Sequence, residues 1–258
     1  MTRNFSKRSV ISNGIDTIWA ADLVEMQKFS KWNEGIKYLL MVIDIFSKYG
    51  WIRGLKDKKT ETVSKAFNDI FKSKRKLQML WPDKGSEFVS KHFKEFLKSK
   101  EIRLYQTENE EKSRVVERCN KTMKKRMWKM FTVNNNTVYW DKTDKLVNDY
   151  NNARHSSVKM TPVEASKKAN EGKAWSNLYG NLIYLKPGKP AFAIEYKVRI
   201  SKYKRQVFDK GYTPNWTEEI FVIDKVLPTK PVTYSIVDLM GEAIKGYFYA
   251  QELQRAKQ

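Results

Sequence analysis

Three carboxylates stand where they could hold metal ions. Asp22 lies within an apolar segment, Asp83 follows the run KLQMLW in the turn that begins at Pro82, and Glu117 falls in the first turn of a predicted long helix. Mg²⁺ and similar hard cations prefer carboxylate oxygens, and a pair of such ions needs oxygens from several elements. If the three side chains meet at one edge of a sheet, they could share two ions.

Each carboxylate also has a structural explanation. Asp83 lies in a turn shortly before Gly85, where aspartate often serves the turn itself. Glu117 could simply interact with the helix dipole, and Asp22 could be a hydrogen-bonded polar group of the core. Asp44, inside a second apolar segment, competes with Asp22 for the same role. Spacing and composition alone do not choose between them.

The segment that carries Glu117 is strongly basic. Residues 112–129 contain eight Lys or Arg and one acid, Glu117. Lys121 and Lys124 follow it at i+4 and i+7, so the three share one helix face. A solvated helix face normally mixes both signs of charge, whereas a phosphate backbone calls for cations only. This pattern favours a nucleic-acid face over a merely solvated one.

The whole chain has 258 residues and a formal net charge of +21, with 41% hydrophobic residues. Such a charge on a folded protein predicts a polyanionic partner, nucleic acid first and an acidic membrane surface second. The alternative is a basic surface kept for solubility. No apolar run approaches the roughly 18 residues of a membrane span, and no secretory signal is recognisable. Because nucleic acid is the favoured partner, no membrane association is expected.

Cysteine and histidine are scarce. The single cysteine, Cys119, cannot form an internal disulfide, which fits a reducing compartment, the cytosol or the nucleus. With His92 and His155 it makes only three such side chains, too few for a structural zinc site with four Cys or His ligands.

Hydrophobic periodicity predicts the elements that must position the carboxylates. Strands are expected at residues 16–24, 37–46, 51–55, 76–81 and 101–106. Helices are expected over 60–74 with Thr60 as N-cap, after Ser90, over 114–131 and 137–150, and after a capping box at Thr161. This order predicts an α/β fold: a five-stranded mixed sheet with helices on both faces.

The composition changes near residue 170. We expect an N-terminal arm at 1–15, a core domain at 16–169, a Gly- and Pro-punctuated linker at 170–195, and a small SH3-like β-barrel at 196–255. The barrel's strands are predicted within 196–200, 217–226, 231–239 and 244–253. Its aromatic residues form either a small core or a cage for methyl-lysine: Tyr212, Trp216, Tyr247, Phe248 and Tyr249.

Four segments in order resemble the catalytic core of retroviral-type DDE integrases: WAADLVEM (19–26), YLLMVIDIFSKYGW (38–51), PDKGSEF (82–88) and VVERCNKTMK (115–124). The stretch YNNARHSSVKMTPVEA (150–165) is similar to the family's tail. Within the family, the chain most resembles integrases of Maverick/Polinton transposons, which share the IDIFSKYGW hairpin and carry a C-terminal chromodomain- or SH3-like module. The resemblance covers roughly residues 16–255.

The resemblance implies an RNase H-like core in which Asp22, Asp83 and Glu117 bind metal, either Mg²⁺ or Mn²⁺ and two ions, while Asp44 is structural. It implies two-metal 3′-end processing and strand transfer, with DNA ends and target DNA as partners, homo-oligomers, a nuclear location and contact with chromatin through the C-terminal module. The DNA-binding residues expected on this basis are Arg114, Asn120, Lys121, Lys124 and Lys125.

Two departures from the family pattern keep other functions open. Residues 1–15 contain no counterpart of the family's His-His-Cys-Cys zinc domain, and Trp81-Pro82 precedes Asp83 where the family has a small residue. The first alternative is a catalytically decayed, transposon-derived protein that only binds nucleic acid. The second is an RNase H-type nuclease, which the C-terminal module disfavours.

Overall fold

The structure, a computed structural model, describes residues 10–73, 75–83, 85–105, 114–183, 188–201 and 215–256. These residues fall into two compact units, and the division of the chain lies after Asn181. Each unit contains one β-sheet with its own hydrophobic core. None of the described helices has the length and apolar character that a membrane span requires.

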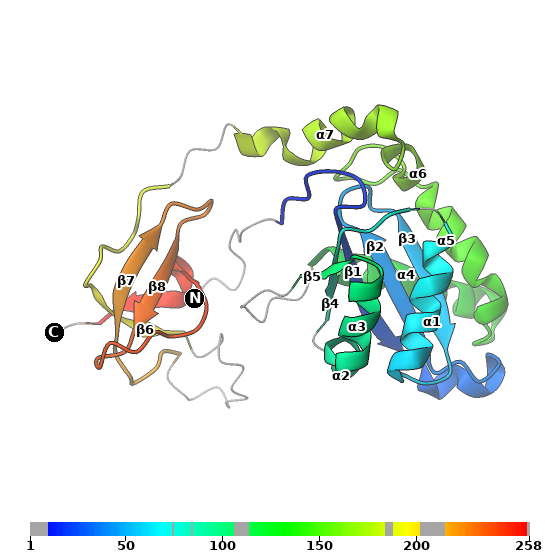
Figure 1. The fold of residues 1–258 in the computed structure, drawn as a ribbon, viewed down its shortest axis with the longest axis horizontal. Coiled ribbons are helices and arrows are strands. Elements are labelled where there is room, and N and C mark those ends of the chain that lie inside the picture. Colours follow the sequence, from blue (N-terminus) through cyan, green and yellow to red (C-terminus); the bar gives the residue numbers. More distant parts are fainter. Residues whose placement is uncertain are drawn as a thin grey trace. The chain divides into compact units, whose positions relative to one another are not determined.

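The first unit is built on a mixed five-stranded sheet with the order β3-β2-β1-β4-β5 (Figure 1). The first three strands pair antiparallel, and β4 and β5 add to β1 in parallel. The predicted five-stranded mixed sheet is therefore confirmed, although its last strand is shorter than expected. The strands are β1 (Ile18–Glu25), β2 (Tyr38–Asp44), β3 (Gly50–Leu55), β4 (Met79–Pro82) and β5 (Arg103–Leu104).

One face of this sheet is covered by three helices that follow β3 and β4 in the sequence (Figure 1). Side chains such as Trp19, Leu40 and Phe67 form the core beneath them, because alternate strand residues point to this side. Ser90 caps the third helix, as predicted. Thr60 is not an N-cap: it begins its helix after Lys59, and its hydroxyl contacts Ser90 Oγ at 3.0 Å. The helices are α1 (Thr60–Phe71), α2 (Ser86–Val89) and α3 (Lys91–Ser99).

The opposite face is covered by α4 (Arg114–Asn134), which packs on β1 and β2, and α5 (Thr143–Asn151), which packs on β3. Gly50 permits the close approach of α5, because a Cβ there would lie 3.3 Å from the ring of Tyr150. Helices thus cover both faces of the sheet, as predicted.

Short elements join and follow these helices. The capping box at Thr161 forms as predicted, with its hydroxyl accepting from Glu164 N. The predicted linker is wrong over Glu171–Ile183, where the chain forms helix α7. Tertiary contacts override the local Gly and Asn signals there: the Tyr179 hydroxyl accepts a hydrogen bond from Ser12 N. The remaining elements are η1 (Gln27–Trp32), η2 (Trp140–Lys142), α6 (Pro162–Ala165) and η3 (Lys168–Asn170).

The second unit holds an antiparallel five-stranded sheet with the order β10-β6-β7-β8-β9. The predicted β-rich module is present, but its sheet is open rather than closed into a barrel: within the described residues, β9 and β10 are opposite edges that do not pair. Its elements are β6 (Lys197–Ile200), β7 (Phe221–Leu227), β8 (Thr233–Val237), β9 (Phe248–Tyr249), η5 (Ala250–Glu252) and β10 (Leu253–Arg255).

Two of the five aromatic residues considered for a cage are buried in this module. Phe248 and Tyr249 are each 3% exposed, and Phe248 packs with the buried residues of the sheet. Trp216 is half-buried and Tyr247 exposed, while Tyr212 lies outside the described residues. The core alternative therefore accounts for Phe248 and Tyr249, because a cage wall has to face solvent.

Candidate active site

Two of the three predicted carboxylates lie on neighbouring strands. In the register of β1 and β4, Ala21 pairs with Pro82, and Asp83 N continues the ladder by donating to Ala21 O at 3.0 Å. Paired residues of parallel strands carry their side chains on the same face of the sheet. Asp22 and Asp83 are the next residues after this pair, so their side chains lie on the same face of the sheet. This is the face that α4 covers, and both side chains are half-buried.

A hydrogen bond joins α4 to this edge. Asn120 Nδ2 donates to Asp22 Oδ2 at 2.6 Å, and Asn120 is only 7% exposed. The resemblance implied a DNA contact for Asn120, but here its side chain is turned inward onto Asp22. Asn120 Oδ1 is buried and has no hydrogen-bond partner among the described residues. The sequence did not predict this pairing, because nothing in it showed which α4 residue would meet β1.

Glu117, the third carboxylate, lies one helical turn before Asn120 and is exposed. Residues three apart on a helix are neighbours, so the Asn120–Asp22 bond brings this part of α4 to the sheet edge. All three candidate residues offer carboxylate oxygens as ligands, and such oxygens suit Mg²⁺ or Mn²⁺. In the part of the chain that the structure describes, no three Asp, Glu, His or Cys side chains converge enough to hold a metal ion.

The predicted basic residues occupy the solvent side of the same helix. Lys121, Lys124 and Lys125 are all exposed. Arg114 is the first residue of α4, and its side chain lies outside what the structure describes. The exposed surface that begins at Glu117 is therefore cationic along the helix.

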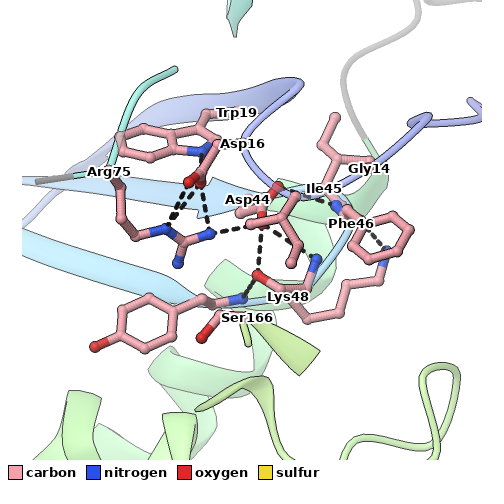
Figure 2. Close-up of polar contacts among 12 residues, drawn as sticks. Gly14, Asp16, Trp19, Asp44, Ile45, Phe46, Lys48, Arg75 and Ser166 are labelled. Carbon is pink, nitrogen blue, oxygen red and sulfur yellow. Dashed lines mark hydrogen bonds and ion pairs between the residues drawn. The ribbon is translucent and has the colours of Figure 1, made fainter. Parts of the chain in front are cut away.

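Asp44 belongs to the other face of the sheet. It pairs with Trp19 in the β1–β2 register, is fully buried, and forms an ion pair with Arg75 at 2.8 Å (Figure 2). Arg75 also pairs with Asp16 and lies 4.9 Å from the centroid of the Trp51 ring. Burial raises the pKa of the Asp44 carboxyl, while Arg75 opposes that shift. This geometry gives Asp44 a structural role, which separates it from Asp22.

Three further ionisable groups behave as parts of the core. Burial raises the pKa of the Cys119 thiol to about 12, so this cysteine is protonated and a poor nucleophile at neutral pH. Lys48, buried in the β2–β3 turn, donates to Ile45 O at 2.6 Å, and burial lowers its pKa to about 8. Burial, with the nearby charges of Lys48 and Arg118, lowers the pKa of His155 to about 4.

The order of the sheet and the helices on both of its faces form an RNase H-like fold. Residues 13–111, less than half of the chain, match the family model described as the integrase core domain. A transposon-derived protein of Caenorhabditis elegans is 33% identical over 198 residues, covering 76% of this chain and 66% of that relative, just under two thirds of its length. Together these matches show that the chain is similar to integrase core domains and to a transposon-derived protein.

Two solved structures are similar to the chain. One is a chain of the simian T-cell lymphotropic virus intasome in complex with the PP2A regulatory subunit B56 gamma, with 15% identity, a TM-score of 0.65, and coverage of 100% of this chain and 84% of that one. At this identity the likeness shows a shared fold. The other is the HTLV-2 integrase catalytic core domain in complex with magnesium, with 22% identity, a TM-score of 0.48, and coverage of 59% of this chain and 97% of that one.

Proposed function

We propose that the protein is a transposon-derived integrase that cuts and joins DNA at Asp22, Asp83 and Glu117. One observation carries this proposal. Asp22 and Asp83 follow a paired position of two parallel strands, and Asn120 holds α4, with Glu117 one turn away, against Asp22. Carboxylates from two strand positions and one helix are the arrangement that a shared pair of divalent cations requires.

The three carboxylates would hold Mg²⁺ or Mn²⁺, and two ions suit a displacement at phosphorus. The chemistry such ions supply is activation of a water or 3′-hydroxyl and stabilisation of the leaving 3′-oxygen. Asn120 orients Asp22 through the 2.6 Å hydrogen bond. Lys121 and Lys124 bind phosphates beside the reacting one. No covalent protein–DNA intermediate is needed, which agrees with the protonated, buried state of Cys119.

The same proposal covers partners and location. The substrates are the element's own DNA ends and target DNA, the active form is a homo-oligomer in the nucleus, and the element is of the Maverick/Polinton type. The second unit, proposed as an SH3- or chromodomain-like module, contacts DNA or chromatin. In support, its edge strand β10 and the neighbouring strand β6 carry the exposed cations Lys197, Arg199 and Arg255.

A second candidate function is nucleic-acid binding without catalysis. Two observations favour it: no three described side chains form a metal cluster, and Pro82 occupies the last paired position of β4, directly before Asp83. A decayed integrase would keep the basic face of α4 while losing the exact placement of its carboxylates.

The experiment incubates the purified chain with Mg²⁺ or Mn²⁺ and duplex oligonucleotides that carry the element's ends, and measures nicking and joining. Asp22→Asn should lower the rate at least roughly 100-fold while DNA binding persists, because the metal loses a ligand. Glu25→Gln, an exposed position on the same strand, is the matched control and should act like the wild type. EDTA should abolish the reaction.

Two results would decide against parts of the proposal. If Asp22→Asn nicks DNA as fast as the wild type, the assignment of the carboxylates is wrong. If neither protein nicks DNA although both bind it, the chain is a DNA-binding protein without this activity.

A further inference from the structure

The exposed face of α4 continues past its lysines to an aromatic residue. Glu117, Lys121, Lys124 and Trp128 follow one another at i, i+4, i+7 and i+11. At 3.6 residues per turn these four positions lie within an arc of about 60°. All four are exposed, and Trp128 exposes 48% of its surface. One stripe of the helix therefore runs from the candidate active site, past two cations, to an indole.

The length of the stripe suits a nucleic-acid strand. Eleven residues at 1.5 Å per residue place Trp128 about 16 Å along the helix from Glu117. At about 3.4 Å per nucleotide in a stacked strand, this corresponds to roughly five nucleotides. A nucleic-acid strand whose phosphates contact Lys121 and Lys124 would therefore reach Trp128 if it continued along the helix.

Trp128 belongs to a group of aromatic residues that we call the indole platform: Phe29, Trp32, Trp128 and Phe131. The Trp128 ring lies edge-to-face with Phe29 at 5.7 Å and with Phe131 at 5.1 Å. Trp32 follows Phe29 by three residues in the 3₁₀ helix η1, where such positions eclipse one another, and it is 55% exposed. Trp128 therefore packs against two phenyl rings, and the exposed Trp32 lies on the same side of η1 as one of them, Phe29.

Hydrogen bonds of the buried Asn33 side chain fix the position of the platform. Asn33, 1% exposed, follows η1, and its side chain makes four hydrogen bonds. Its Nδ2 donates to Phe29 O at 2.8 Å and to Thr137 O at 3.0 Å. Its Oδ1 accepts from the backbone N–H groups of Tyr139 at 2.7 Å and Trp140 at 3.1 Å. These bonds join η1 to the segment after α4, so the aromatic surface is pre-organised for a ligand.

The charge around the platform selects the ligand. Lys28 and Lys31 of η1, and Lys125 and Lys129 of α4, are all exposed. Exposed aromatic rings among cations match single-stranded nucleic acid, which offers phosphates and uncovered base faces together. In a duplex the base faces are covered by stacking, so an indole has nothing to stack on.

We propose that the indole platform binds unpaired nucleotides of a DNA strand whose backbone follows Lys121 and Lys124. This inference rests on the proposed function for its source of unpaired DNA: trimming a 3′ end leaves the complementary 5′ end without a partner. Trp128 is then a positioning residue that holds the unpaired end away from the reacting phosphate.

The test measures fluorescence anisotropy of labelled oligothymidine and of a blunt duplex with the full chain in EDTA, so that catalysis plays no part. Trp128→Ala and Trp128→Leu should weaken binding of oligothymidine at least about fivefold, because leucine is apolar but has no π face. Trp128→Phe should stay within about twofold of the wild type, and the duplex should be affected less. Val133→Ala, 83% exposed and about 140° away around α4, should change nothing.

Oligothymidine binding by Trp128→Leu at wild-type strength would overturn the proposal, because stacking would then be unnecessary. A change of oligomeric state in Trp128→Ala by light scattering, with oligothymidine binding intact, would instead make the platform an interface between copies. If the wild type fails to nick DNA but Trp128→Ala still loses oligothymidine, the proposed function fails while the platform stands.

Discussion

At the scale of single residues, Asp22 and Asp44 show how strand parity separates two similar carboxylates. Both lie in apolar strands, and the sequence does not rank them. Because β1 and β2 pair in a fixed register, Asp44 falls opposite Trp19, whereas Asp22 falls opposite Met41 on the α4 side. One is fully buried with Arg75 as its counter-ion, and the other is half-buried beside Asn120. The role proposed for Asp22 therefore depends on the face of the sheet that it occupies rather than on its local apolar context.

His155 gives a prediction at the same scale. Its pKa is lowered to about 4 in the folded chain, against about 6.5 unfolded, by burial and by Lys48 and Arg118. Between these values the unfolded chain binds more protons, so stability should be lost as pH falls from about 6.5 to 4. His155→Gln should remove this loss, on the order of 1–2 kcal/mol after discounting for partial exposure.

The measurement is urea unfolding at several pH values, with the difference between His155→Gln and the wild type plotted against pH. His92→Gln controls for the loss of a histidine from an exposed helix position. A difference that stays constant from pH 7 to 4 would contradict the assigned cause, because a group that does not change its proton binding cannot produce a slope.

At the scale of elements, the sequence predicts the helices and strands that have a strong hydrophobic periodicity or a clear cap. It does not predict the elements whose structure depends on contacts with distant residues. The buried runs of β1 and β2, the stripe of α4 and the capping box at Thr161 all carry their signal locally. The Gly and Asn residues of α7 predict a linker, because they are typical of loops, whereas the contact of α7 with Ser12 joins residues that are distant in sequence. The edge that joins Asp22 and Asp83 was predictable from strand ends, but the Asn120–Asp22 bond was not.

The capping box provides the element-scale prediction. Thr161→Ala removes the hydroxyl that accepts from Glu164 N at 3.1 Å, so the start of α6 loses a capped backbone N–H. The expected cost is about 1 kcal/mol of unfolding free energy, or roughly 2–4 °C in Tm. Thr122→Ala on α4, where the exposed hydroxyl only bonds back to Arg118 O, should stay within about 0.5 kcal/mol. Equal losses in the two variants would show that the cap has no special weight.

At the scale of the whole molecule, the net charge of +21 is unevenly placed along the chain. Residues 112–129 carry eight basic residues and one acidic residue, whereas residues 77–111 carry six basic and seven acidic. Helix α4 therefore concentrates cations on the face of the sheet that holds Asp22, and α3 covers the other face. A basic surface that served only solubility would not explain this asymmetry. DNA binding along α4 would explain it.

Salt dependence of DNA binding tests this asymmetry. Each phosphate neutralised by a cation contributes about 0.9 to the slope of log affinity against log salt. Lys121→Ala combined with Lys124→Ala should therefore lower the magnitude of this slope by about 1.8. Lys94→Ala with Lys98→Ala removes the same charge from exposed positions of α3 and should leave the slope nearly unchanged. If both pairs lower it equally, the protein binds DNA through its diffuse field and α4 has no special place, because a uniform field does not distinguish the two helices.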